Sequence, residues 1–371
     1  MRLSVTYYVR SDAASIAERA QAIAVEQSVE MPLPAIDEPA VLRDIVGQVE
    51  EIADLRDGRF AVRIGLALST IGGDAGQLLN MLFGNTSLHD DVVLHDIALP
   101  PDLLAAFPGP RTGIAGLRAR VGATGRALTC SALKPQGLPP ERLATLAERF
   151  ALGGVDYIKD DHGLADQAYS RFAGRVPAIA AAVRRASAST GHPTRYLPSL
   201  SGHFEQMRDQ VRIARDAGLD TVMLAPMVAG FATTQALTAA FPDMAFFAHP
   251  SLGGAARIAP PLLIGTLFRL IGADAVIFPN YGGRFGYSPE TCRSLADHAR
   301  AALPGVRQSL PVPAGGMTLA RVGELLDFYG PDAMLLIGGN LLMARDDLTR
   351  ETTAFTRAVA GHTYRQDSHG H

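Results

Sequence analysis

Ionisable side chains are concentrated at the end of one apolar segment near the middle of the chain. Residues 153–163 read GGVDYIKDDHG, so an apolar run closes on Lys159, Asp160, Asp161 and His162. Aspartate and histidine are ligand types for metal ions, and a lysine beside carboxylates can act as a base, form a Schiff base or carry a carbamate. The alternative interpretation is a solvated turn after a strand, and other segments of the chain argue against it.

Other charged or glycine-rich groups follow further apolar segments in the same way. Any one of them alone is more often an ordinary loop residue, but they recur at the ends of successive segments. Glycine pairs at such positions can hold a phosphate through backbone N–H groups. The pattern therefore predicts one site that binds a phosphorylated ligand. Its candidate residues beyond the central segment are Lys134, His249, Arg284, Gly315, Gly316, Gly338 and Gly339.

The elements that position these groups alternate between strand and helix from residue 127 onward. Eight such units over about 230 residues is the size of a (β/α)8 TIM barrel, whose catalytic residues lie at the carboxyl ends of the strands. A doubly wound open sheet would also alternate, but eight repeats favour closure. Strands are predicted near Ala127–Leu133, Tyr157–Lys159, Thr194–Leu200, Thr221–Ala225, Ala245–His249, Ala275–Phe278, Ser309–Pro313 and Ala333–Ile337.

An internal repeat supports the barrel. The pattern Gly-x-Asp occurs just before each even-numbered strand, at Asp156, Asp220, Asp274 and Asp332. Its spacing corresponds to about two strand–helix units. Helices are predicted between the strands, for example at Glu141–Leu152, Glu205–Ala217, Pro289–Leu303 and Leu319–Phe328.

Residues 1–126 predict a separate α+β domain of ferredoxin-like type. Turn-forming residues at 109–113 and glycines up to Gly125 mark its end, so the predicted units are 1–126, the barrel at 127–361 and a flexible polar tail at 362–371. The predicted elements of the first unit are strands at Leu3–Val9, Phe60–Ala67 and His95–Ala98 and helices at Ala13–Glu26, Gly76–Phe83 and Pro100–Phe107.

Composition excludes several classes of protein. The chain has 371 residues, 47% of them hydrophobic, which suffices for a large core and a smaller domain. A net charge of −3 without a basic stripe argues against nucleic-acid binding. Cys130 and Cys292 make no disulfide framework. The N-terminus lacks the apolar core of a signal peptide, and no run reaches the roughly 18 residues of a membrane span. These features predict a cytoplasmic protein without membrane partners.

The motifs and their order resemble the large subunit of ribulose bisphosphate carboxylase/oxygenase (RuBisCO) over nearly the whole chain. GGVDYIKDDHG is similar to the family segment whose lysine is carbamylated, and 127–138 (ALTCSALKPQGL) is similar to the strand that carries an acid/base lysine. In the N-terminal half, 24–32 (AVEQSVEMP) and 83–88 (FGNTSL) resemble segments that supply a Glu and an Asn to the neighbouring subunit's active site.

The resemblance implies roles for single residues. One Mg²⁺ per subunit would be held by Asp161, His162 and a CO₂-derived carbamate on Lys159. The glycine pairs would bind a substrate phosphate, and the protein would be a homodimer with shared sites, or a higher oligomer. The implied catalytic residues are Lys134, Lys159, His249, Arg284, Glu26 and Asn85.

Departures from the family pattern indicate that the chain is not a CO₂-fixing carboxylase. His162 replaces a ligand Glu, Gln136 a lysine, and Arg284 the lysine that holds CO₂. Pro250 and Ile277 stand where the carboxylase binds its second phosphate, which implies a monophosphate ligand. The chain is therefore identified as a RuBisCO-like protein.

Proteins of this group form an enediolate from a carbonyl compound. Arg284 can pair with a substrate carboxylate, so the predicted activity is a decarboxylase (a carbon–carbon lyase) of the 3-oxo-isoapionate 4-phosphate type in carbohydrate catabolism. The alternatives are the enolase for 2,3-diketo-5-methylthiopentyl-1-phosphate or the isomerase for 5-methylthioribulose-1-phosphate, both of methionine salvage. A catalytically inactive, phosphate-sensing barrel is a further alternative, against which Lys134, Lys159 and Asp161 argue.

Overall fold

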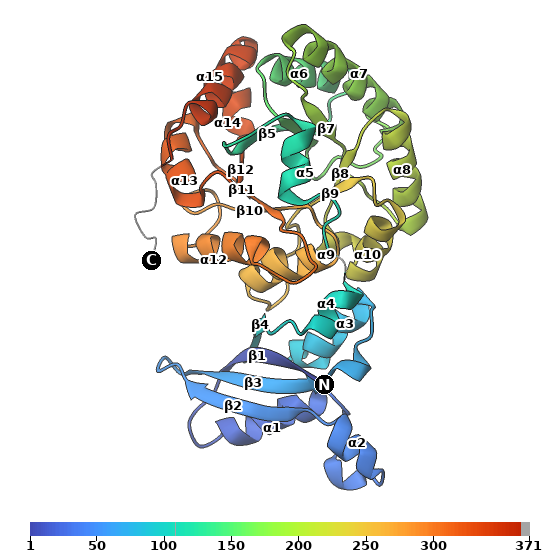
Figure 1. Ribbon diagram of the computed structural model, residues 1–371, viewed down its shortest axis with the longest axis vertical. Coiled ribbons are helices and arrows are strands. Elements are labelled where there is room, and N and C mark those ends of the chain that lie inside the picture. The colour runs from blue at the N-terminus through green and yellow to red at the C-terminus, as the bar shows by residue number, and fades with distance from the viewer. Residues whose placement is uncertain (108, 365–371) are drawn as a thin grey trace.

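The protein consists of a small sheet domain and a large ring of strands and helices. The computed structural model describes residues 1–107 and 109–364. Figure 1 shows the ring of helices around an inner circle of strands, with the N-terminal sheet beside it. Within the described residues, no helix is both long and apolar enough to cross a membrane.

The N-terminal domain has the predicted ferredoxin-like sheet. Its strands are antiparallel in the order β2-β3-β1-β4, and alternate residues of β1 are buried, as a strand with one covered face requires. Strand β2 and helix α2 were not predicted. The elements are β1 (Arg2–Arg10), α1 (Ile16–Glu26), η1 (Leu33–Ala35), α2 (Pro39–Asp44), β2 (Gln48–Asp54), β3 (Arg59–Ala67), η2 (Leu68–Thr70), α3 (Ala75–Phe83), η3 (Asn85–Leu88), β4 (Val92–Ile97) and α4 (Pro101–Ala106).

The C-terminal unit is the predicted barrel. Parallel pairing gives two four-stranded runs, β12-β5-β6-β7 and β8-β9-β10-β11. A bridge between Ser199 and Met223 joins β7 to β8, and β11 lies beside β12, so the strands form a closed ring. The strands are β5 (Leu128–Leu133), β6 (Tyr157–Asp160), β7 (Arg195–Leu197), β8 (Thr221–Leu224), β9 (Ala245–Ala248), β10 (Ala275–Pro279), β11 (Leu310–Ala314) and β12 (Met334–Leu336).

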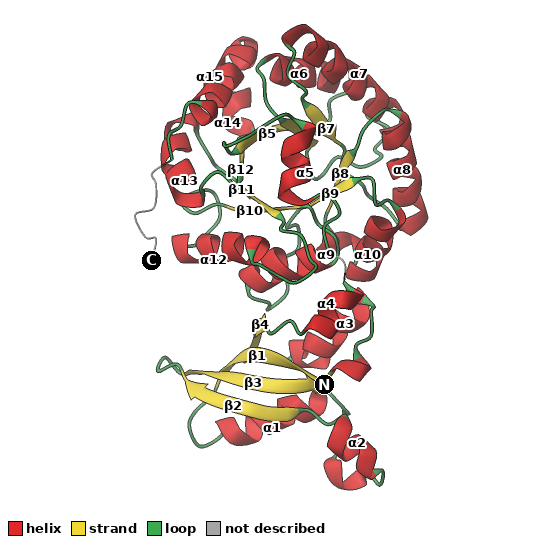
Figure 2. Ribbon diagram, in the orientation of Figure 1, coloured by secondary structure: helices red, strands yellow, loops and turns green. Residues whose placement is uncertain are grey.

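Helices cover the outside of the ring, as Figure 2 shows in red around the yellow strands. Because both faces of the strands are covered, their residues are almost all buried, and apolar side chains such as Leu128, Phe247 and Val312 fill the interior. The elements are α6 (Pro140–Leu152), α7 (Phe172–Thr190), α8 (Phe204–Asp216), α9 (Pro226–Ala229), α10 (Phe231–Ala240), η4 (Pro261–Leu267), α11 (Phe268–Leu270), α12 (Pro289–Arg300), η5 (Leu319–Arg321), α13 (Val322–Tyr329), α14 (Gly339–Leu342), η6 (Arg345–Asp347) and α15 (Leu348–Ala360).

One helix lies inside the ring where the sequence indicated only a glycine-rich connection. Helix α5 (Gly113–Arg120) occupies the centre of the circle in Figure 1. Ile114 and Leu117 pack with the interior side chains, and the Leu117 carbonyl accepts a hydrogen bond of 2.8 Å from the Tyr157 hydroxyl. Although it precedes the predicted division at residue 126, α5 therefore closes one end of the barrel.

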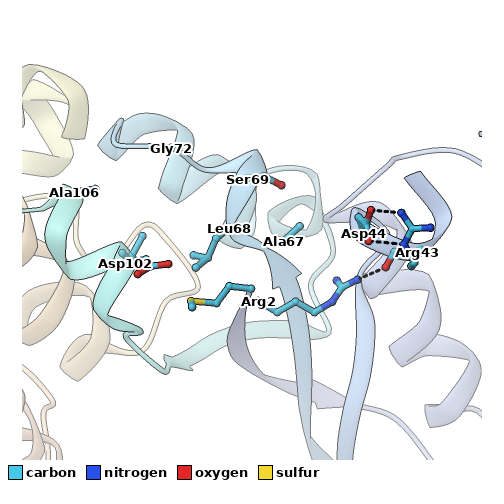
Figure 3. Close-up of a pocket in the computed structure, with 11 residues that line it drawn as sticks. Arg2, Arg43, Asp44, Ala67, Leu68, Ser69, Gly72, Asp102 and Ala106 are labelled. Carbon is cyan, nitrogen blue, oxygen red and sulfur yellow. Dashed lines mark hydrogen bonds and ion pairs between the residues drawn. The ribbon is translucent and has the colours of Figure 1, made fainter. Parts of the chain in front are cut away.

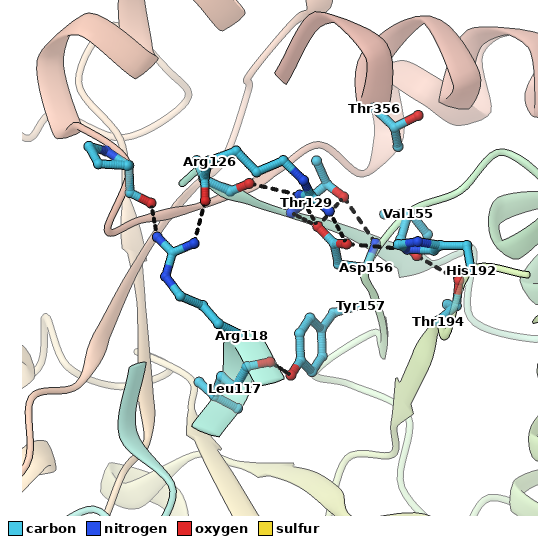
Figure 4. A network of polar contacts seen from close by, with 12 residues as sticks. Leu117, Arg118, Arg126, Thr129, Val155, Asp156, Tyr157, His192, Thr194 and Thr356 are labelled. Carbon is cyan, nitrogen blue, oxygen red and sulfur yellow. Dashed lines mark hydrogen bonds and ion pairs between the residues drawn. The ribbon is translucent and has the colours of Figure 1, made fainter. Parts of the chain in front are cut away.

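The Gly-x-Asp repeat supplies the anchors for this region. The Asp274 carboxylate accepts the backbone N–H groups of Thr112 and Gly113 at 2.7 and 2.8 Å, at the start of α5. Asp332 pairs with Arg118 at 2.8 Å, and Asp220 with Arg120 at 3.5 Å. Asp156 pairs with Arg126 at 2.7 Å, next to Thr129 and His192, as Figure 4 shows. The repeat thus fixes the closed end, opposite to the ends that carry the predicted site.

The last described residues pack against the barrel. The Tyr364 hydroxyl accepts the backbone N–H of Ala127 at 2.8 Å, and His362 contacts Asp327 at 3.1 Å. The remainder of the predicted tail, residues 365–371, lies outside the described residues.

Candidate active site at the barrel mouth

The ends of three strands bring the predicted charged residues together. Lys134 follows β5, Asp161 and His162 follow β6, and His249 follows β9. Lys134 Nζ forms an ion pair with Asp161 Oδ2, and His162 Nδ1 lies 3.4 Å from Asp161 Oδ1. The rings of His162 and His249 stack with centroids 4.5 Å apart and planes 8° from parallel. The four side chains form one cluster, which we call the barrel-mouth cluster.

Lys159 lies beneath this cluster. Its side chain belongs to β6 and is buried, and its Nζ donates to the Asp160 carbonyl at 2.8 Å. Burial lowers the pKa of Lys159, although the charge of Asp161 acts in the opposite direction. Desolvation favours the neutral amine, which is the form that reacts with CO₂ or takes up a proton.

Asp161 keeps its negative charge. Burial alone would raise its pKa, but the hydrogen bond with Lys134 and the 2.9 Å bond from the Gly163 backbone N–H outweigh burial, and the pKa falls to about 2. The carboxylate is therefore ionised over the whole neutral range.

The neighbouring Asp160 has a structural role. Its carboxylate is buried and bonded to Arg175 at 3.2 Å, to the Tyr196 hydroxyl at 2.8 Å and to the Ser199 backbone N–H at 3.1 Å. These contacts hold the end of β6 and so position Asp161. Arg175, Tyr196 and Ser199 were not predicted, because they come from α7 and from the β7 region and no local motif marks them.

Both histidines of the cluster are neutral at physiological pH. Burial lowers the pKa of His162, and the positive charges of Lys159, Lys134 and Arg284 add to that effect. Burial likewise lowers the pKa of His249 to about 2. Ser251, which was not predicted, places its hydroxyl 2.8 Å from His249 Nδ1.

Arg284 lies on the loop after β10, which packs on the glycine pair after β11. The Arg284 backbone N–H donates to the Gly315 carbonyl at 3.3 Å, and the guanidinium lies 5.5 Å from the centre of the Phe285 ring. A Cβ on Gly316 would meet Arg284 N at 3.1 Å, and both Gly315 and Gly316 have positive φ, at 88° and 86°. The close packing of the two loops and the positive φ values require glycine at both positions. This requirement is independent of any role of the two glycines in phosphate binding.

The second glycine pair follows β12. Gly338 precedes α14 and Gly339 is its first residue. The Asn340 side chain donates to the Met317 carbonyl at 2.6 Å, which ties this loop to the one after β11. The two pairs therefore lie on adjacent, connected loops.

Glu26 and Asn85 are near each other but belong to the N-terminal domain. Asn85 Nδ2 donates to Glu26 Oε1 at 2.9 Å. Helix α1, which ends at Glu26, lies at the far end of the molecule from the ring in Figure 1. Among the described residues, no hydrogen bond or ion pair links Glu26 or Asn85 to the barrel-mouth cluster of the same subunit.

A cavity of about 550 Å³ lies elsewhere, in the N-terminal domain. Three of the charged residues that line it already contact one another, since Arg2 donates to the Arg43 carbonyl at 3.1 Å and Arg43 pairs with Asp44 at 2.8 Å, as Figure 3 shows. None of the predicted site residues lines it. We therefore assign the candidate site to the barrel mouth.

The side chains at the barrel mouth can be compared with the ligands that a metal ion needs. Within residues 1–107 and 109–364, no three His, Cys, Asp or Glu side chains are grouped to hold a metal ion. Asp161 and His162 offer two ligands, and the buried amine of Lys159 lies under them. A carbamate on Lys159 would add the oxygen ligand that a hard cation prefers, so the residues present fit Mg²⁺ in that form.

Comparisons with known proteins agree on one family. Residues 113–276 match the model for the ribulose bisphosphate carboxylase large chain, catalytic domain. A 5-methylthioribulose-1-phosphate isomerase of Rhodospirillum rubrum is 65% identical, over 97% of this chain and 96% of that protein. A 2,3-diketo-5-methylthiopentyl-1-phosphate enolase of Geobacillus thermodenitrificans is 30% identical, over 97% and 92%. The crystal structure of a Rubisco-like protein from Rhodopseudomonas palustris is 51% identical, covers 98% of this chain and 99% of that one, and has a TM-score of 0.92.

The prediction of a decarboxylase is wrong. The 65% identical relative is named an isomerase and a more distant one an enolase, and neither name describes a lyase. That prediction depended on Arg284 as a partner for a substrate carboxylate. A guanidinium pairs equally well with phosphate, so arginine at this position does not define a carboxylate substrate.

Proposed function

Because the chain belongs to the RuBisCO large-chain family, as one of its RuBisCO-like proteins, we propose that it is a metal-dependent isomerase of 5-methylthioribulose-1-phosphate. The observation that carries the proposal is the barrel-mouth cluster with the buried amine of Lys159 beneath it. These residue types at one strand edge can remove, hold and return a proton next to a carbonyl group.

The proposed reaction moves a carbonyl group along the sugar chain. A proton leaves the carbon next to the ketone, the electron pair of that C–H bond forms the double bond of an enediol, and a proton returns to the former carbonyl carbon. Nothing is gained or lost, so no oxidant or co-substrate is needed. The protein must stabilise the oxygen that becomes negative and must keep the proton near both carbons.

The metal site in this proposal consists of Asp161, His162 and a carbamate on Lys159. A bound Mg²⁺ would polarise the ketone oxygen and so make the adjacent C–H bond more acidic. Asp161 is ionised, and Lys134 is its present partner. A cation held by Asp161 would take the place of Lys134 as its partner, so we assign Lys134 the acid/base role toward the sugar.

The phosphate in this proposal binds at the two glycine loops. Gly315, Gly316, Gly338 and Gly339 lie on adjacent loops that Asn340 connects, and Arg284 packs against the first pair. Ile277 is buried in the barrel interior and, like the ring of Pro250, offers no donor to a second phosphate. A monophosphate with an uncharged methylthio end fits this distribution of charge.

The complete site in this proposal requires two subunits. Glu26 and Asn85 bond to each other on the N-terminal domain, and the described residues show no bond from either of them to their own barrel-mouth cluster. In a homodimer they would face the mouth of the partner barrel, which the sequence resemblance also implies. The pair would then bring one carboxylate and one amide to the substrate.

The test is an assay of the purified protein with Mg²⁺ and bicarbonate. We expect conversion of 5-methylthioribulose-1-phosphate into an isomer of equal mass, resolved by ¹³C NMR, and loss of conversion with EDTA or in Lys159→Ala. Turnover of 2,3-diketo-5-methylthiopentyl-1-phosphate in its place would favour the enolase, which the 30% identical relative supports. Absence of both reactions would contradict the proposal.

A further inference from the structure

The loop after β9 places a serine against the histidine of the barrel-mouth cluster. The His249 backbone N–H donates to the Leu224 carbonyl at 2.8 Å, so the start of the loop continues the pairing with β8. The Ser251 hydroxyl lies 2.8 Å from His249 Nδ1, and the Ser251 backbone N–H donates to the same nitrogen at 3.3 Å. Two groups of one residue therefore converge on one ring nitrogen.

These contacts determine where the ring carries its proton. A backbone N–H can only donate, so Nδ1 must be the acceptor, and the hydroxyl must donate to it as well. A neutral ring then has its proton on Nε2. The His162 ring stacks on one face of the His249 ring, and this contact restricts rotation of the His249 ring.

The loop that carries Ser251 forms a tight turn and contains one residue in a strained conformation. The Gly253 N–H donates to the Pro250 carbonyl at 2.8 Å and closes a tight turn around Ser251 and Leu252. Leu252 has φ of 62°, a left-handed conformation that is unfavourable for a residue with a side chain. Strain of this kind is typical of functional sites, where the surrounding structure maintains it.

We propose that Ser251 is a positioning residue that fixes His249 with its proton on Nε2, so that His249 donates a hydrogen bond to the substrate oxygen on which negative charge develops. The inference rests on the proposed isomerase. In this inference His249 acts as an electrophile, that is, as a hydrogen-bond donor to the developing negative charge. Proton transfer remains the role of Lys134. A neutral imidazole gives up its N–H proton reluctantly, which suits a donor that must stay protonated throughout the reaction.

The tautomer can be tested without substrate. In full-length protein labelled with ¹⁵N-histidine, long-range ¹H–¹⁵N correlations distinguish a proton on Nε2 from one on Nδ1, and His249→Gln identifies the signal. His298 is an internal reference, because its Nδ1 lies 2.7 Å from the Ser294 carbonyl and must therefore carry the proton. We expect His249 to show the Nε2–H pattern and His298 the Nδ1–H pattern. A proton on Nδ1 of His249 would overturn the inference, whether or not the protein isomerises the sugar.

The role of the serine can be tested by three variants. We expect Ser251→Ala to lower kcat about tenfold with KM changed by less than about twofold, because one of two orienting bonds is lost. Ser251→Thr retains the hydroxyl and should restore kcat to within about twofold of the wild type. Ser294→Ala removes a hydroxyl 3.4 Å from a histidine Nδ1 outside the site and is the matched control.

The outcomes separate this inference from the proposed function. Equal kcat values for Ser251→Ala and Ser251→Thr, in variants whose circular dichroism and melting temperature match the wild type, would overturn the role of the serine. If 5-methylthioribulose-1-phosphate is not converted at all, the isomerase proposal fails. In that case the position of the His249 ring proton, on Nε2 or on Nδ1, decides the inference alone.

Discussion

At the scale of single residues, burial and ion pairing decide the chemistry of the barrel mouth. Lys159 is buried without a carboxylate bonded to its Nζ among the described residues and is pushed toward the neutral amine. Asp161, two positions later, remains charged because Lys134 and a backbone N–H stabilise it. The site therefore places a reactive amine beside a permanent negative charge, which is the combination that carbamate formation and cation binding require.

Asp161→Asn should lower kcat/KM by about a hundredfold or more, because it removes the charge that pairs with Lys134 and that, in our proposal, binds the cation. Steady-state kinetics with a Mg²⁺ titration would measure the effect. Asp346→Asn is the matched control, since Asp346 is a fully exposed carboxylate paired only loosely with Arg149 at 3.8 Å. Full activity of Asp161→Asn would exclude Asp161 from the metal site.

The neutral histidines predict a pH dependence of stability. The pKa of His249 falls from about 6.5 in an unfolded chain to about 2 in the folded protein. Between these values only the unfolded state binds the proton, so stability falls as the pH falls below about 6.5. In EDTA-treated protein we expect a loss of about 2 kcal/mol from pH 7 to pH 5, measured by urea unfolding. The loss should be smaller in His249→Gln, and an equal loss would contradict the neutral, buried state of His249.

Residue positions at strand ends could be predicted, but their partners could not. Lys134, Asp161, His162 and His249 meet as expected, because parallel strands end at one edge. Asp160, unlike Asp161, has a structural role because its carboxylate bonds to Arg175, which is fifteen positions away on the next helix. Contacts of that kind leave no local pattern in the sequence.

At the scale of elements, the barrel strands were predictable and the closing helix was not. Strands such as β5, β8 and β9 are mostly apolar and are buried at every position, as a sheet covered on both faces requires. Helix α5 (GIAGLRAR) contains two glycines and hardly any amphipathic pattern. Strand β2 was missed because five of its seven side chains are exposed and three of those are charged, so apolar alternation is weak. Both elements are determined by what packs around them.

The anchoring of α5 can be tested within the Gly-x-Asp repeat. Asp274→Ala should destabilise the protein by about 3–5 kcal/mol, because three backbone N–H groups, two of them buried, lose their acceptor. These are the N–H groups of Thr112, Gly113 and Phe246. Asp332→Ala, which removes a half-exposed ion pair with Arg118, should cost less than about 1 kcal/mol. Urea unfolding would measure both, and similar losses would show that the repeat does not act through buried N–H groups.

At the scale of the whole molecule, the fold followed from the sequence and the reaction did not. The ferredoxin-like domain and the barrel were both predicted. The decarboxylase was inferred from one substitution, Arg284, although the same guanidinium serves phosphate or carboxylate. Which carbon loses a proton depends on how the complete pocket orients the sugar, and part of that pocket belongs, in our proposal, to a second subunit.

Shared sites predict complementation between inactive variants. Glu26→Ala and Lys134→Ala homodimers should each be inactive, while mixed dimers contain one site in which both residues are intact. Mixing the two proteins should therefore restore up to about a quarter of the wild-type activity per site, if subunits exchange at random. Subunit exchange would be verified by native mass spectrometry. Exchange without recovery would place Glu26 outside the partner's site.

The most direct test of the isomerase is ¹H NMR of 5-methylthioribulose-1-phosphate with the Mg²⁺- and bicarbonate-treated protein in D₂O. The proposal predicts an isomeric ketose with an unchanged number of carbon atoms. Deuterium should appear at a carbon next to a carbonyl group to the extent that the proton held by the protein exchanges with solvent. Lys159→Ala should leave the spectrum of the substrate unchanged. An unchanged spectrum with the wild-type protein, while the diketo phosphate is enolised, would contradict the account.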